Sequence, residues 1–243
     1  MEIKDSVVLI TGAALRVGRT TAIHLAQRGA NIVFTYYQDS EPWQEAKEEI
    51  EACGVKVMAR QLEVRSAQQI ETLVKDVISD FGRIDVLINN AAVWLKNDFL
   101  DISEQEWDLA LDINLKGPFL TSSQVAPYML VQGNGVIINI TDLSAFQVWP
   151  GYAHHAASKA GLVALTKAMA VELAPCVRVN AIAPGTVLLP EDAPPAKKQW
   201  AVDRSCLKRI GTPEDVARMA TFLIESEFTT GAVYFVDGGR SLV

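Results

Sequence analysis

The stretch that decides the fold is Val7-Val8-Leu9-Ile10-Thr11-Gly12-Ala13-Ala14-Leu15-Arg16-Val17-Gly18. Its unbroken apolar start is typical of a strand covered on both faces, and it predicts a strand over Val7–Thr11. A helical pattern follows over Val17–Arg28 and is closed by Gly29. Glycines at such a turn let the backbone approach a pyrophosphate, and the helix N-terminus adds N–H donors and a positive dipole end. The stretch therefore predicts a phosphate-binding turn, with a merely tight turn as the alternative.

The rest of the chain repeats this alternation of buried strand and helix. Further apolar runs predict strands over Asn31–Thr35, Val55–Arg60, Asp85–Ile88, Val136–Ile140, Val177–Ala183 and Ala232–Val236. Helical patterns lie over Glu41–Ala52, Ser66–Phe81, Ser103–Val131, His155–Leu173 and Pro213–Glu225. Right-handed crossovers between such strands build a doubly wound parallel sheet with helices on both faces. We therefore expect an α/β, single-domain Rossmann fold over residues 1–243, with seven parallel strands and an irregular substrate-lid segment at Gly185–Gly211.

Composition narrows the class of protein. The chain has 243 residues, of which 49% are hydrophobic and 21% charged, and its formal net charge is −7. These values exclude wholesale disorder, and the negative charge argues against nucleic acid, whose partners carry basic patches. The charged start lacks signal-peptide features, and no apolar run approaches the ~18 residues of a membrane helix. The cysteines Cys53, Cys176 and Cys206 are too few and too widely spaced for a disulfide framework or a zinc site. We expect a cytoplasmic protein with no membrane partner and no metal.

Motifs in a fixed order along the chain resemble the short-chain dehydrogenase/reductase family. After the Thr-Gly-x-x-x-x-x-Gly turn come Asn89-Asn90-Ala91-Ala92, Asn114 in Asp112–Gly117, Ser158-Lys159, Ala183-Pro184-Gly185 and Asp237-Gly238-Gly239. The resemblance spans nearly the whole chain. It implies an oxidoreductase that moves a hydride between a nicotinamide cofactor and a small-molecule substrate. It also implies a homodimer or homotetramer built on the helix of Asn114 and the helix His155–Leu173, although the small residues of His155–Leu173 also suit packing on the sheet.

The same resemblance implies which residues hold the cofactor. They lie in the glycine turn, at the strand ends, in the catalytic helix and in the Pro-Gly turn: Thr11, Gly12, Ala14, Arg16, Val17, Gly18, Tyr36, Tyr37, Glu63, Val64, Asn90, Ala91, Lys159, Pro184, Gly185 and Val187. Two departures favour NADPH (NADP) over NADH (NAD). Arg16 replaces the middle glycine and suits an extra phosphate, unless it is a solvated surface charge. The second strand ends in Tyr36-Tyr37-Gln38, where NAD-specific members have an acid, and we interpret the nearest acid, Asp39, as a loop residue.

The catalytic region departs from the family at two positions. In the family, a tyrosine acts as general acid or base four residues before the lysine, a serine precedes it by thirteen, and an asparagine supports a proton-relay water. This chain has Lys159 and Asn114, but His155 stands in place of the tyrosine and Asp142 in place of the serine. Imidazole is a competent general acid, although it is shorter than a phenol and titrates in a different range. From the sequence, His155 acts directly, acts through a bridging water, or marks lost activity.

A narrower resemblance concerns the substrate. Asp142, Arg16 and Trp94 together are similar to the pteridine reductase and dihydromonapterin (dihydrofolate) reductase branch. A carboxylate accepts hydrogen bonds from the N–H groups of a pterin, and an indole stacks on its ring. The substrate candidates are Arg16, Trp94, Asp142 and Tyr152, with Tyr152 expected just before the helix and His154 in a loop or at the rim. Simpler roles are a cap for Asp142 and a core-lining aromatic for Trp94.

Three hypotheses for the function follow. The first is an NADPH-dependent reductase of a pterin-like or carbonyl substrate. The second is a catalytically impaired nucleotide-binding homologue, because the tyrosine is missing. The third is a general alcohol dehydrogenase or 3-oxoacyl reductase, for which a serine is expected at position 142.

Overall fold

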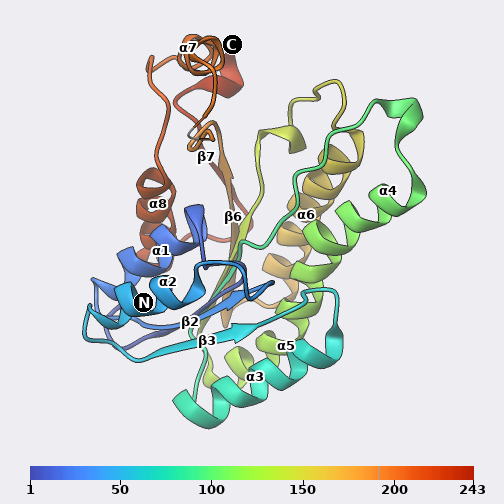
Figure 1. Cartoon of the computed structure of the whole chain (residues 1–243). Coiled ribbons are helices and arrows are strands. Elements are labelled where there is room, and N and C mark those ends of the chain that lie inside the picture. Colours follow the sequence, from blue (N-terminus) through green and yellow to red (C-terminus); the bar gives the residue numbers. More distant parts are fainter. Residues whose placement is uncertain (191) are drawn as a thin grey trace.

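A computed structural model describes residues 1–190 and 192–243 and contains one seven-stranded sheet. Its strands are all parallel, in the order β3-β2-β1-β4-β5-β6-β7 (Figure 1). Their bounds are β1 Val7–Ile10, β2 Asn31–Tyr36, β3 Val57–Gln61, β4 Val86–Asn89, β5 Gly135–Ile140, β6 Val177–Pro184 and β7 Val233–Val236. The predicted doubly wound Rossmann fold is confirmed.

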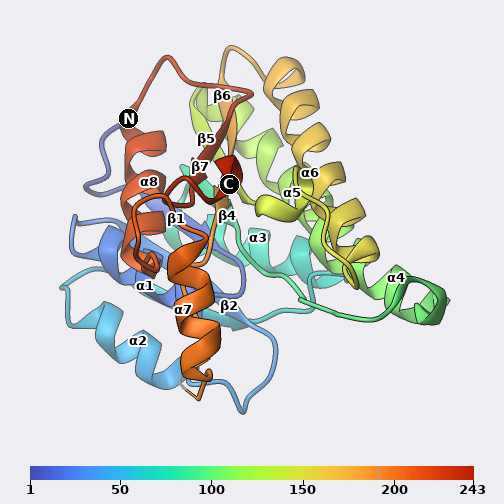
Figure 2. The ribbon, with the colours of Figure 1, turned by 90° about the horizontal axis from the view of Figure 1, so that it is seen from above.

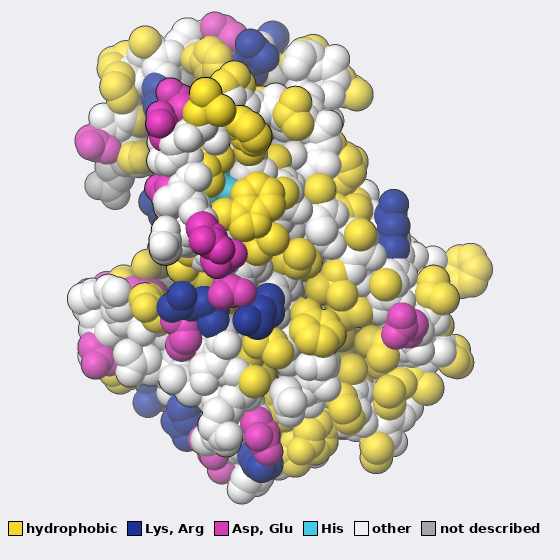
Figure 3. Space-filling view, turned by 90° about the vertical axis from the view of Figure 1, so that its right-hand side faces the viewer, with side chains coloured by type: hydrophobic (Ala, Val, Ile, Leu, Met, Phe, Trp, Pro, Cys, Tyr) yellow, Lys and Arg dark blue, Asp and Glu magenta, His cyan; other side chains and the backbone are white. Residues whose placement is uncertain are grey.

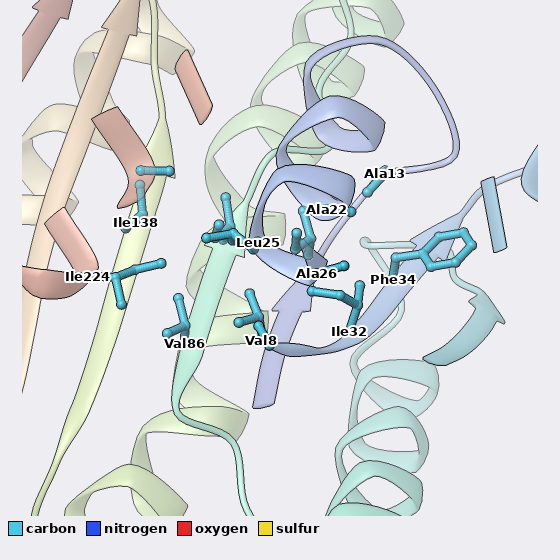
Figure 4. Packing of buried hydrophobic residues seen from close by; sticks show 14 of the residues in the cluster. Val8, Ala13, Ala22, Leu25, Ala26, Ile32, Phe34, Val86, Ile138 and Ile224 are labelled. Carbon is cyan, nitrogen blue, oxygen red and sulfur yellow. The ribbon is translucent and has the colours of Figure 1, made fainter. Parts of the chain in front are cut away.

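Every residue of β1 is apolar, and successive side chains of a strand point to opposite faces of the sheet. Both faces therefore bury apolar side chains, and helices cover both of them. Val8 and Ile10 pack with α1 (Arg16–Ala26), α2 (Trp43–Glu51) and α8 (Pro213–Glu225). Val7 and Leu9 pack on the other face with α3 (Ala67–Phe81), α5 (Gly117–Gln132) and α6 (Ala153–Glu172). Figure 4 shows the first of these layers, with side chains of α1 lying against those of the central strands.

The strand order reverses at β1, whose neighbours are β2 and β4. At such a switch point the two connections leave in opposite directions, which opens a crevice at the carboxyl ends of the strands. The turns after β1, β4 and β5 therefore meet at one edge of the sheet, and they carry most of the predicted site residues.

Two predicted segments differ from the structure in their details. The helix expected over Ser103–Val131 is divided into α4 (Glu104–Leu111), a π-helical turn at Asp112–Lys116, and α5. The segment Gly185–Gly211, expected to be irregular, contains α7 (Pro195–Asp203), which lies next to the C-terminal end of the chain (Figures 1 and 2). The sequence does not reveal the helical pattern of α7 because the helix is short and begins at a proline. Proline is nevertheless a favoured first residue of a helix.

Among the described residues, no helix is both long enough and apolar enough to cross a membrane. The cytoplasmic location stays a prediction.

Candidate active site

A cavity of about 550 Å³ opens at the switch point of the sheet. Ten of the predicted cofactor-binding residues line it: Gly12, Arg16, Val17, Gly18, Tyr36, Tyr37, Glu63, Val64, Asn90 and Ala91. Two side chains tie its walls together. Thr11 Oγ1 accepts hydrogen bonds from the backbone N–H groups of Asn90 (3.0 Å) and Ala91 (3.1 Å). Asn90 Nδ2 donates in return to the carbonyls of Thr11 (3.0 Å) and Gly12 (2.8 Å).

The glycines of the turn are required by the approach of these two loops. Gly12 has a φ of +63°, and a Cβ built on it would lie 2.9 Å from Ala91 Cα. A Cβ on Gly18 would lie 2.6 Å from Asn90 Nδ2. Packing alone therefore explains both glycines, so their presence is not by itself proof of a ligand.

The start of α1 supplies the independent observation that this cavity fits a dinucleotide. The residue before the helix, Leu15, makes no side-chain cap, and the first turn contains no acidic residue. The free N–H groups at a helix start favour an anion, and Leu15, Arg16, Val17 and Gly18 all line the cavity. A pyrophosphate placed there would satisfy these donors.

Arg16 holds a backbone conformation that usually belongs to glycine. Its φ is +54°, in the left-handed region, which costs a residue with a side chain about 1–2 kcal/mol. The side chain is exposed, and no carboxylate of residues 1–190 or 192–243 lies within ion-pair distance of it. The guanidinium is thus free to meet an anion at this end of the cavity.

Two further charged residues line this end and were not predicted. Glu41 lies in the loop after β2, and its Oε1 accepts hydrogen bonds from the backbone N–H groups of Tyr37 (2.8 Å) and Gln38 (2.9 Å). Arg65 pairs with Glu63 at 2.6 Å. The sequence predicts Asp39 as the nearest acid to this strand end, but the acid that folds back onto it is Glu41. A search limited to the first residues after the strand misses an acid four residues past Tyr37.

Other predicted cofactor residues lie outside the lining of this cavity. Thr11 and Ala14 are buried behind the turn. Pro184 ends β6, and Gly185 and Val187 follow it; Gly185 N donates to the carbonyl of Val236 at 3.0 Å. Lys159 is buried in α6. Their roles toward a cofactor stay predictions.

Asn114 lies in the π-helical turn and is fully buried. Its Oδ1 accepts from Val93 N (2.9 Å), and its Nδ2 donates to Val93 O (3.1 Å) and to Ser158 Oγ (3.1 Å). The widened turn exposes its side chain to the loop after β4, as π-helical turns often do at functional sites. Asn114 therefore joins that loop to α6.

His155 forms an ion pair with Asp142. Its Nε2 lies 2.6 Å from Asp142 Oδ2, and its Nδ1 lies 3.2 Å from the carbonyl of Val93. Asn114 Nδ2 is also 3.4 Å from Nδ1, but both of its hydrogens are used on other acceptors. Each ring nitrogen thus faces a hydrogen-bond acceptor, the Asp142 carboxylate at Nε2 and the Val93 carbonyl at Nδ1.

Asp142 is the counter-ion of this site. Burial raises the pKa of its carboxyl, but the hydrogen bond from His155 and the charges of Lys159 and His155 outweigh burial, so the pKa lies below its usual value. The other oxygen, Oδ1, accepts from Ser144 N at 2.7 Å and from the Ser144 hydroxyl. The carboxylate therefore caps the turn at Leu143–Ala145 and also holds His155, so the simpler role and the functional one coexist.

Lys159 is buried one helical turn beyond His155. Its Nζ donates to the carbonyl of Ile140 at 2.8 Å, which leaves further donors on the ammonium group. Burial lowers the pKa of Lys159, and the charge of Asp142 opposes this shift. The spacing of four between His155 and Lys159 places both on one face of α6, as predicted.

Aromatic rings form the mouth of the site. The Trp94 ring lies 4.3 Å from the His155 ring and 5.0 Å from that of Tyr152, measured between centroids. Trp94 is 54% exposed, so it belongs to the mouth and not to the core. Tyr152 directly precedes α6, as predicted, and Trp149 lies 6.2 Å from Trp94.

The prediction that His154 is a loop or rim residue is wrong. It lies in the first turn of α6, fully buried, and neither ring nitrogen has a hydrogen-bond partner among the described residues. Burial lowers its pKa against the charge of Glu106. The helix begins two residues earlier than predicted, and this shift moves His154 to an inward-facing position.

Comparisons with known proteins agree with this geometry. A family model described as "Enoyl-(Acyl carrier protein) reductase" matches residues 12–241. The chain is 38% identical to the 3-oxoacyl-[acyl-carrier-protein] reductase FabG of Thermotoga maritima, over 98% of this chain and 99% of that protein. It is 35% identical to the (2S)-[(R)-hydroxy(phenyl)methyl]succinyl-CoA dehydrogenase subunit BbsD of Thauera aromatica, over 100% of this chain and 99% of that protein.

Solved structures give the same result. A short-chain dehydrogenase/reductase from Burkholderia xenovorans superposes with a TM-score of 0.93 at 31% identity, covering 100% of this chain and 98% of that one. A Serratia marcescens short-chain dehydrogenase/reductase mutant gives 0.92 at 29% identity, covering 99% and 100%.

The fold and the site define a dinucleotide-binding oxidoreductase. The chain belongs to the short-chain dehydrogenase/reductase family. Membership implies a nicotinamide cofactor. The two named relatives of known activity are a 3-oxoacyl-[acyl-carrier-protein] reductase and a (2S)-[(R)-hydroxy(phenyl)methyl]succinyl-CoA dehydrogenase subunit, and neither is a pteridine reductase.

Proposed function

We propose that this protein reduces a carbonyl group with NADPH and that 3-oxoacyl thioesters are its first substrate class. The observation that carries the proposal is its similarity to 3-oxoacyl-[acyl-carrier-protein] reductases, at 38% identity across 98% of the chain. The third hypothesis from the sequence thus has better support than the pterin-like one, although position 142 lacks the expected serine.

The residues have distinct tasks in this reaction. When bound, the nicotinamide cofactor supplies the hydride to the carbonyl carbon. His155 gives a ring N–H proton to the carbonyl oxygen as negative charge develops there, and the product is an alcohol. Asp142 holds the His155 ring in place beforehand, at 2.6 Å. Lys159 directs its free donors toward ribose hydroxyls, and Asn114 fixes the loop at Val93 that contacts His155.

The preference for NADPH rests on the charges at the adenosine end of the cavity. Glu41 is engaged by two backbone amides, and Arg65 is paired with Glu63. Arg16 is the cation that keeps its donors for a ligand. A guanidinium binds a ribose phosphate through a pair of hydrogen bonds, so it favours the phosphorylated cofactor.

A second substrate class is favoured by one observation, the buried carboxylate at position 142. A serine hydroxyl can donate to a carbonyl oxygen, whereas an ionised carboxylate can only accept. A pterin-like ring offers N–H donors to Asp142 and a flat face to Trp94. The same assay therefore includes dihydropterins beside carbonyl compounds.

We also propose a homodimer through α5 and α6. The small residues Ala157, Ala160, Ala164 and Ala168 of α6 are exposed and do not pack on the sheet. Exposed apolar side chains lie nearby in sequence, among them Phe119 and Val131 on α5 and Val171 on α6. Figure 3 shows hydrophobic side chains spread over this side of the molecule.

The test of the function follows NADPH oxidation by the unaltered protein, by His155→Gln and by His155→Tyr. The substrates are acetoacetyl thioesters, simple ketones and dihydropterins. We expect turnover of a 3-oxoacyl thioester by the unaltered chain and a loss of about 100-fold or more in His155→Gln, since general acid catalysis contributes on that scale. No turnover by the unaltered chain, together with turnover by His155→Tyr, would instead identify a catalytically impaired homologue.

A further inference from the structure

Arg240 lies close to the mouth of the site although it comes from the far end of the chain. It begins the short C-terminal turn Arg240–Leu242. Its guanidinium carbon is 4.9 Å from the ring centroid of Trp200, on α7, and 5.1 Å from that of Trp149, in the loop before α6. Figures 1 and 2 show α7 beside the C-terminal end of the chain. The guanidinium thus joins the lid segment to the active-site loop.

Most of its hydrogen-bond donors have no partner. Within residues 1–190 and 192–243, the hydroxyl of Thr186 is the one acceptor it meets, and no carboxylate lies within ion-pair distance. The nearest acid in sequence, Asp237, accepts instead from the backbone N–H groups of Gly239 (2.9 Å) and Ser241 (2.7 Å). A guanidinium has five N–H donors, so an edge remains for a ligand.

A second cation strengthens the local field. The guanidinium carbon of Arg204 lies 5.7 Å from the centroid of the same Trp200 ring. Burial lowers the pKa of Arg240, and the charge of Arg204 lowers it further, while the charges of Asp237 and Asp142 oppose this shift. An anion placed between the two arginines would relieve this repulsion.

The guanidinium is linked to the reacting groups through successive ring contacts. A row of ring contacts leads from it to Trp149 (5.1 Å), to Trp94 (6.2 Å) and on to His155 (4.3 Å). A substrate whose carbonyl oxygen meets His155 can therefore extend along the aromatic rings toward Arg240.

We propose that Arg240 binds an anionic group of the substrate, a carboxylate or a phosphate, and makes the protein a reductase of acidic ketones. The two indoles hold the guanidinium plane, and Thr186 fixes one edge, so little conformational freedom is lost when the anion binds. The proposal rests on the proposed carbonyl reduction, whose substrate class it narrows.

The experiment compares ketones that differ only in the group at the far end of the ring. They are 4-acetylbenzoate, 4-acetylphenyl phosphate and the neutral methyl 4-acetylbenzoate. In Arg240→Gln, we expect KM for the preferred anionic ketone to rise about 10- to 100-fold, with kcat and the KM of the neutral ester little changed. The KM of Arg240→Lys should lie between those of the unaltered protein and Arg240→Gln, because lysine keeps the positive charge but lacks the paired donors of a guanidinium. Lys197→Gln, which removes an exposed cation from α7, is the matched control and should leave every KM unchanged.

A binding measurement separates this proposal from the proposed function. Calorimetric titration of the NADP-loaded protein with each anionic ketone should show binding that Arg240→Gln loses, even if no substrate turns over. The anionic ketone that binds more tightly shows whether the site prefers a carboxylate or a phosphate. Equal KM values for the acid and the ester, or binding that survives Arg240→Gln, would overturn the proposal. Weaker NADPH binding in Arg240→Gln would also overturn it, since Arg240 would then serve the cofactor phosphates.

Discussion

The cofactor cavity and the catalytic end lie at the same edge of the sheet, yet they are built by different means. Around the cavity, the hydrogen bonds join side chains to the backbone. Asn90 donates to two backbone carbonyls, Thr11 accepts from two backbone amides, and Glu41 accepts from two more. At the catalytic end, side chains hold one another through charge, with Asp142 2.6 Å from His155.

This difference explains which changes each region tolerates. A backbone-built site constrains conformation and space but not the identity of exposed side chains, so it can accept an arginine where a glycine is usual. A charge-built site requires its partners to be matched, because an unpaired buried charge is costly. The replacement of serine by Asp142 and of tyrosine by His155 is therefore a matched pair, since each residue supplies what the other needs.

Among the variants that test this contrast, Asp142→Asn is expected to have the largest effect. An amide cannot act as the counter-ion of His155, so we expect kcat to fall about 100-fold or more, with NADPH affinity unchanged. Steady-state kinetics and cofactor titration measure the two quantities. Ser144→Ala removes a hydrogen bond to the other oxygen of the same carboxylate, leaves the contact with His155 in place, and should cost less than about tenfold.

The stability of Asp142→Asn should also differ from that of the unaltered protein in its dependence on pH. Since the pKa of Asp142 is lowered in the folded state, its ionised form contributes stability above about pH 4, the ordinary range for aspartate, and this is lost as pH falls through the folded value. The gap in unfolding free energy between the unaltered protein and Asp142→Asn should narrow on acidification below about pH 4. A gap that stays constant would show that no charge pair stabilises the fold there.

An intermediate effect is expected from Gly12→Ala, which tests the backbone-built region. Both Gly12 and Gly82 have positive φ, +63° and +77°, but a Cβ on Gly82 meets nothing within 4 Å. We expect Gly82→Ala to cost about 1–2 kcal/mol of unfolding free energy for the left-handed backbone alone. Gly12→Ala should cost about 1–3 kcal/mol more, because its Cβ meets Ala91. Urea unfolding of both variants measures the difference; equal losses would contradict the packing argument.

The smallest effect is expected from Arg16→Gly, which should move stability and cofactor preference in opposite directions. Glycine relieves the left-handed strain at φ +54°, so unfolding free energy should rise by about 0.5–1 kcal/mol. The preference for NADPH over NADH should fall about tenfold, since the phosphate loses a charged partner. Arg19→Gln, on the same helix, is the control for general charge. An unchanged ratio of the two dissociation constants would assign Arg16 to the solvated surface.

The order of the elements was predictable because it depends on local patterns. Short apolar runs predicted all seven strands, and the resemblance to the family assigned catalytic positions to Asn114, Asp142, His155 and Lys159. The errors have local causes too. The π-helical turn at Asp112–Lys116 interrupts a helix that the sequence predicts to continue through Gly117 and Pro118, and α7 is too short for a clear period.

The sequence by itself determined the doubly wound sheet, the position of the phosphate-binding turn and the residue types at the catalytic positions. These depend on hydrophobic period and on spacing within one helix or turn, which the order of residues contains. The tertiary structure alone decided that Asp142 bonds His155, that Glu41 folds back onto Tyr37, and that Arg240 reaches the aromatic mouth. The contacts of Asp142 and Arg240 join different elements and follow from how these elements pack, whereas the contact of Glu41 depends on how one loop folds.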